Sequence, residues 1–245
     1  MSHRHGVFGF QQTLPPIIKY GLTFLFVQSE FGLCCPLSMT DSLTRTLTKF
    51  GDEKLVEKFF DQLTSQDLDH LFQGAMFMTE QHAGSDVGSI DTFAEFENGN
   101  WFLTGDKWFC SNPDADLAMV LARHNKEISG TKGLALFLLP KTLENGDPNN
   151  YEIIRLKDKL GGRSFASGEI RLNKAFAYLV GNPNEGFKQM TDMINMSRLS
   201  NGVRASGMMQ RCFQESLFIS NTRHAFNKKL IDLPLMQKQL LKMLV

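Results

Sequence analysis

The 245-residue sequence has little cysteine, no net charge and no long hydrophobic run. Cys34 and Cys35 are adjacent, whereas Cys110 and Cys212 are isolated, so the four cysteines form neither a disulfide framework nor a paired zinc motif. Basic and acidic residues number 26 each, which gives no general attraction for nucleic acid or for an anionic membrane. Sparse cysteines favour reduced thiols, and we expect a cytoplasmic protein.

Two further absences limit the kinds of site and location. The longest apolar run near the start, Leu22 to Val27, is too short to span a membrane and lacks a signal-peptide cleavage site, so we expect no membrane partner. Among the six histidines only His3 and His5 are grouped, in a polar tail, and we therefore expect no metal site. Hydrophobic residues make up 42% of the chain, which is enough for a sizeable core.

The first part of the chain has the apolar spacing of helices. One helix is predicted over Pro15–Phe31, and the Gly32–Pro36 segment is expected to end it. Thr40 or Asp41 is expected to cap a second helix, and a third is expected after Gly51–Asp52.

The middle of the chain changes to strand periodicity. An alternating stretch before Asn98–Gly99–Asn100 and an aromatic stretch after it predict a β-hairpin. Further short strands are expected over residues 117–122, 134–139, 151–154 and 169–172. About seven short strands in succession are typical of a barrel or a sandwich.

The remainder returns to helical spacing. Val180–Gly186 reads as a linker, a long helix follows it, and Leu235–Val245 begins another helix whose apolar residues need partners. The predicted fold class is α+β, with N-terminal helices, a central antiparallel β-barrel or sandwich and the start of a C-terminal helical bundle. The expected domains are residues 1–72, 73–179 and 180–245, and we expect the bundle to be truncated.

Two short stretches carry the functional signal. Gly74–Ser85 reads GAMFMTEQHAGS, and Gly105–Asn112 reads GDKWFCSN. Glycines that permit close approach, hydroxyl donors and an aromatic face together suit a flat polar heterocycle. From the residues alone, an ordinary turn followed by a core strand remains an alternative.

These stretches resemble the flavin-binding signature of the acyl-CoA dehydrogenase family. The strings KLGGRSFASGEI and RHAFNKKLIDLPLMQ follow in the order expected for that family, and several motifs are more similar to its AidB branch. The resemblance implies bound FAD, an acyl-CoA substrate and a homo-oligomer. In this pattern Thr79 meets the pyrimidine edge of the flavin, and Phe109 and Ser111 lie against the ring. The implied cofactor residues in the two motifs are Phe77, Met78, Thr79, Gly84, Ser85, Phe109, Cys110 and Ser111.

The resemblance also implies a second group of cofactor residues near the end of the chain. Arg223 and Phe226 match a pair that holds the flavin diphosphate across a subunit interface, and a guanidinium suits that task. Asn227 and Pro234 depart from the family pattern here, and a solvated basic helix face remains an alternative.

The catalytic base remains unknown. In the family it lies on a helix beyond the end of this chain or at the position of Ser197, and a serine cannot serve unaided. We expect turn-capping or surface roles for Glu80 and Asp86. The main hypothesis is FAD-dependent α,β-dehydrogenation of acyl-CoA thioesters. An AidB-like flavoprotein that binds DNA and an inactive fragment are the alternatives.

Overall fold

Three helices precede the sheet in the computed structural model, which describes residues 8–10, 12 and 14–244. They are α1 (Pro16–Val27), α2 (Cys34–Phe50) and α3 (Glu53–Leu63). Helix α2 begins well before Thr40, so the expected cap was wrong. Pro36 lies in its first turn, where the missing amide costs no helical hydrogen bond. The third helix was predicted correctly, and the Asp52 side chain caps it by accepting from the Leu55 amide at 2.9 Å.

A seven-stranded sheet forms the centre of the molecule. Its strands run in the order β1-β3-β2-β4-β5-β7-β6, and further β1–β4 and β3–β7 pairings close it into a barrel. Most pairs are antiparallel, as expected, but β4 pairs in parallel with β1 and β2. The strands are β1 (Gly74–Phe77), β2 (Phe93–Glu97), β3 (Asn100–Ser111), β4 (Leu117–Arg123), β5 (Leu134–Pro140), β6 (Tyr151–Leu156) and β7 (Ser167–Val180).

The predicted hairpin joins β2 to β3. Glu97 pairs with Asn100, and the two residues between them have positive φ, 50° at Asn98 and 84° at Gly99. Asparagine and glycine tolerate this conformation, which gives the turn the twist that two flanking strands need. The local sequence therefore determines this element.

Two apolar cores lie on opposite faces of the sheet. One fills the barrel around Phe77, Leu103 and Phe137. The other joins helices α2, α3 and α4 (Gly186–Thr222) to the outer face of β4 and β5, with Leu43 and Met193 among its members. Since β4 and β5 are buried on both faces, they read as continuous apolar runs. The second core draws on all three expected domains, whose boundaries stay a prediction.

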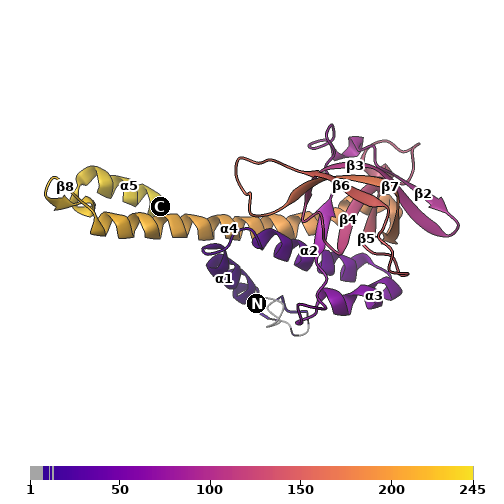
Figure 1. Ribbon diagram of the computed structural model, residues 1–245, viewed down its shortest axis with the longest axis horizontal. Coiled ribbons are helices and arrows are strands. Elements are labelled where there is room, and N and C mark those ends of the chain that lie inside the picture. The colour runs from indigo at the N-terminus through magenta and orange to yellow at the C-terminus, as the bar shows by residue number, and fades with distance from the viewer. Residues whose placement is uncertain (1–7, 11, 13, 245) are drawn as a thin grey trace.

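The 37-residue helix α4 (Gly186–Thr222) gives the molecule its elongated shape. Figure 1 shows it starting beside the sheet, passing over α1 and α2, and extending well beyond them. Its far end carries the short β8–β9 hairpin (His224–Ala225 and Lys228–Lys229), and α5 (Pro234–Leu244) folds back along it. No helix in the described part of the chain is long and apolar enough to cross a membrane.

Candidate cofactor site

The β1–β3 pairing brings the two sequence motifs together. Met76 of β1 lies opposite Ser111 of β3, and the Trp108 amide donates to the Thr79 carbonyl at 2.8 Å. The register between β3 and β7 shifts between Lys107 and Cys110. Such an irregularity bends a strand and redirects its side chains. Thr79 and Ser111 consequently sit on neighbouring backbone segments although they are far apart in sequence.

Strand alternation separates the expected site residues into two groups. Phe77 and Cys110 are buried within the barrel core, so only their backbone can face a ligand. Burial raises the pKa of the Cys110 thiol to about 12, which keeps it neutral. Phe109 points the other way and is 54% exposed, with Trp108 edge-on to it at 6.4 Å between ring centroids.

The loop after β1 is anchored by Glu80. Its carboxylate accepts hydrogen bonds from the Asp91 amide at 2.7 Å, the Thr92 amide at 3.0 Å and the Lys107 ammonium at 2.8 Å. Glu80 is 3% exposed, so the surface role was wrong, whereas the hydrogen bonds to two backbone amides of the loop agree with the capping role. Asp86, which accepts from the Ser89 hydroxyl, does remain exposed.

Lys107 explains why an acid can be buried there. Its side chain is fully buried, and its ammonium also donates to the carbonyls of Leu121 at 2.9 Å and Met78 at 3.3 Å. Burial alone would raise the pKa of Glu80, but Lys107 and the hydrogen bonds outweigh burial and lower it. The sequence analysis missed Lys107, and the available signal was a lysine on an otherwise core-forming strand.

The outer surface of the two motifs offers free polar groups. The hydroxyls of Thr79, Ser85 and Ser111 have no hydrogen-bond partner among the described residues, and Gly84 and Ser85 are exposed. Unpaired hydroxyls beside the exposed ring of Phe109 match the edge and face of a flat heterocycle. The residues present therefore fit a flavin ring.

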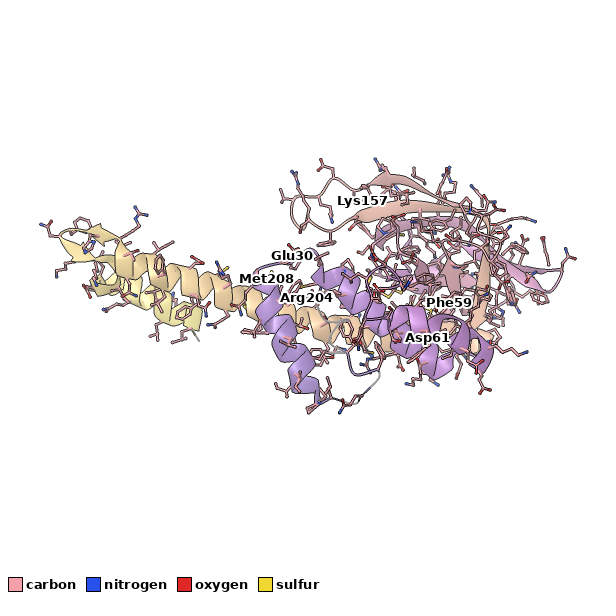
Figure 2. The ribbon with its side chains drawn as sticks, turned by 60° about the horizontal axis from the view of Figure 1, so that its bottom comes forward. Glu30, Phe59, Asp61, Lys157, Arg204 and Met208 are labelled. Atoms are coloured by element: carbon pink, nitrogen blue, oxygen red, sulfur yellow. The ribbon has the colours of Figure 1, made fainter. Side chains whose placement is uncertain are left out.

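Lys157 was not anticipated as part of this region. It follows β6, and its ammonium lies 3.0 Å from the centroid of the Trp108 ring and 4.7 Å from that of Phe109. The same ammonium donates to Glu169 at 2.6 Å. Figure 2 labels Lys157 where the chain leaves β6. A cation over an aromatic face fixes the position of both groups.

Arg223 and Phe226 lie at the opposite end of α4 from the sheet (Figure 1). A helix of this length spans about 55 Å at 1.5 Å per residue. Both residues are exposed. They are thus too far away to join the Thr79 and Ser111 site of the same chain, so any shared site needs a second subunit.

His82 is exposed and lies 3.1 Å from Asp91, and no three metal-ligating side chains cluster within the described ranges.

Two family models match the chain. The acyl-CoA dehydrogenase middle domain matches residues 75–175, and the acyl-CoA dehydrogenase C-terminal domain matches residues 184–245. Acyl-CoA dehydrogenase family member 11 of Caenorhabditis elegans is 34% identical over 96% of this chain and 40% of its own length. Putative acyl-CoA dehydrogenase AidB of Escherichia coli is 36% identical over 89% of this chain and 41% of its own length. The chain thus spans about 40% of the length of these curated relatives.

Solved structures agree with the sequence comparisons. ACDH-11 of Caenorhabditis elegans in complex with C11-CoA superposes with a TM-score of 0.90 at 33% identity, covering 99% of this chain and 43% of that one. A glutaryl-coenzyme A dehydrogenase in complex with glutaryl-CoA gives a TM-score of 0.87 at 25% identity, covering 99% and 62%. The two family models match adjacent parts of the chain, and the solved relatives have the same fold over nearly all of it. The chain belongs to the acyl-CoA dehydrogenase family.

Proposed function

We propose that this chain carries the flavin-ring site of an FAD-dependent oxidoreductase that dehydrogenates acyl-CoA thioesters at the α and β carbons. The observation that carries the proposal is the convergence of Thr79, Ser111 and Phe109 through β1–β3 pairing. The relatives support the substrate class, since the solved structure of one of them contains C11-CoA.

Each residue of the site has a task in this proposal. The Thr79 and Ser111 hydroxyls would hydrogen-bond the edge of the flavin ring, and Phe109 would pack against its face. FAD, when bound, would accept the hydride that leaves the β carbon. Glu80 and Lys107 would fix the Thr79 backbone from the interior, without contact with the reacting atoms.

The proton that leaves the α carbon requires a base. Ser197 is half-buried on α4, and Glu80 is engaged in its ion pair. Neither can act as that base, so the proposal assigns it to a part of the protein outside residues 1–245. The diphosphate of FAD would be held by Arg223 and Phe226 of a second subunit in a homo-oligomer.

Titration of FAD into the purified chain, followed by flavin fluorescence and visible absorbance, tests the ring site. The double variant T79V/S111A removes two hydroxyls and should weaken binding about thirtyfold, because each hydrogen bond contributes about 1 kcal/mol. The matched control is S216A, a half-buried serine on α4 whose hydroxyl bonds only to its own helix. Equal FAD affinities for wild type and T79V/S111A would show that the two hydroxyls do not contact the flavin.

A further inference from the structure

A cavity separate from the flavin-ring motifs lies between the β2–β3 hairpin, the end of β7 and the turn from α2 to α3. Its volume is about 420 Å³, and none of its lining residues belongs to Gly74–Ser85 or Gly105–Asn112. Cavities of this size accommodate small organic molecules. The chemistry of the lining therefore determines which kind of molecule fits.

Aromatic side chains dominate the lining of this cavity. Five of them contribute, namely Phe50, Phe96, Trp101, Phe176 and Tyr178. Phe96 lies directly opposite Trp101 on the paired strands, with 5.1 Å between the ring centroids, and Phe176 lies 4.8 Å from Tyr178 on β7. Phe96 is 61% exposed. Since the face of an aromatic ring carries negative partial charge, such a wall attracts cations as well as apolar groups.

One carboxylate lies in the same lining. Asp52 is exposed and is the single charged residue among the described residues that line the cavity. Its Oδ1 accepts from the Leu55 amide at 2.9 Å, which caps α3, and no described cationic side chain pairs with it. The charge of the cavity is therefore negative, which favours a cation and disfavours an anion.

Two of the five rings already contact ammonium groups. Lys49 Nζ lies 4.9 Å from the centroid of the Phe50 ring, and Lys58 Nζ lies 4.8 Å from that of Tyr178. Neither lysine lines the cavity, and each is paired with a carboxylate of its own. No cation of the described chain lies over the other three rings. Those three rings remain available to a ligand.

We propose that this cavity binds a small organic cation, whose ammonium group lies against the rings of Phe96 and Trp101 and faces Asp52. A quaternary ammonium suits the cavity best, because it is bulky, donates no hydrogen bond and is attracted by ring faces. The carboxylate supplies the counter-charge. The flavin-ring site uses none of these residues, so failure of one proposal leaves the other intact.

Choline is the probe, and the neutral alcohol in which carbon replaces the choline nitrogen is its matched control. The chain has two tryptophans, and NMR at constant ionic strength follows the indole Nε1–H signal of each during titration. The variant W101F assigns the signals. We expect the Trp101 signal to shift saturably while that of Trp108 stays in place, and the alcohol to bind at least about fivefold more weakly than choline. Equal affinities for the two ligands, or no saturable shift of the Trp101 signal, would overturn the proposal.

Two variants test the named contacts. D52N removes the charge but keeps a side-chain oxygen that can cap α3, and F96L replaces an exposed ring with an aliphatic group. We expect each to weaken choline binding about fivefold or more. The control D61N removes an exposed carboxylate from α3 that does not line the cavity, and it should bind choline as wild type does (Figure 2). Wild-type affinity in both D52N and F96L would show that choline binds elsewhere.

Discussion

Two buried cations in this chain occupy contrasting surroundings. Lys107, in the sheet, has a carboxylate and two carbonyls within reach of its ammonium. Arg204, on a helix, has no acceptor among the described residues. The contrast separates two kinds of buried cation, because Lys107 is completely partnered and joins segments of the sheet, whereas Arg204 leaves its Nε unsatisfied.

The backbone accounts for this difference. Lys107 of β3 reaches the Leu121 carbonyl of β4 and the Met78 carbonyl just past β1, and β3 and β4 both pair with β1 and β2 in the closed sheet. Arg204 lies in the middle of α4, and the carbonyls of its own helix already accept from amides four residues later. A helix interface therefore offers a buried cation fewer acceptors than a sheet does.

The largest effect should come from removing the Lys107 ammonium, which has a complete set of hydrogen-bond partners. K107M keeps the aliphatic stem but leaves Glu80 buried without its cation. We expect a loss of about 3–5 kcal/mol in the free energy of unfolding, as for other buried pairs that lose one partner. Urea denaturation followed by circular dichroism measures it. The control K107M/E80Q removes both charges and should recover part of the loss, whereas a drop below about 1 kcal/mol in K107M would contradict a structural role.

The same pair gives a pH dependence. Since the folded state lowers the pKa of Glu80 below its ordinary value of 4.5, its contribution is complete above that value. The contribution is lost as the pH falls through the lowered pKa. Wild type should therefore lose stability in acid more steeply than K107M/E80Q, and parallel acid curves would show that Glu80 does not contribute.

A second prediction concerns the packing that buries Arg204. G207A places a methyl group against Val27 and the Phe24 carbonyl, so we expect a loss of about 1–3 kcal/mol. The control G202A lies on the same helix with open space around its Cβ, and it should gain about 0.5–1 kcal/mol because alanine favours helix. Urea denaturation of both variants reports the opposite signs. Equal changes would show that α1 does not press on α4 at Gly207.

Short-range sequence signals determined several elements correctly. Asn98–Gly99 predicts its own turn, and Gly51–Asp52 predicts where the third helix begins, because each acts on atoms within a few residues. The start of α2 was missed because proline was read as a terminator, although it is tolerated in a first turn. Local chemistry is sufficient only where the partners are local.

The candidate site likewise has one part that the sequence predicts and another part that only the structure shows. The motif pair was recognisable through its resemblance to a family signature, but the Glu80–Lys107 pair joins residues on separate segments, and its formation depends on strand register. The isolation of Arg204 is a property of three packed helices, and helical periodicity cannot reveal a missing partner. Both the partner of Glu80 and the missing partner of Arg204 could thus be found only from the structure.

The smallest effect should come from an exposed ion pair between β7 and β3, the strand that also carries Lys107. The Arg171 guanidinium donates two hydrogen bonds of 2.9 Å each to the Asp106 carboxylate, and both side chains are about half exposed. Those hydrogen bonds lower the pKa of Asp106. In R171Q that pKa should rise toward its ordinary value in an NMR titration while the Tm stays nearly unchanged, because water replaces the lost contacts. A fall in Tm comparable to that of K107M would show that burial is not what distinguishes the two pairs.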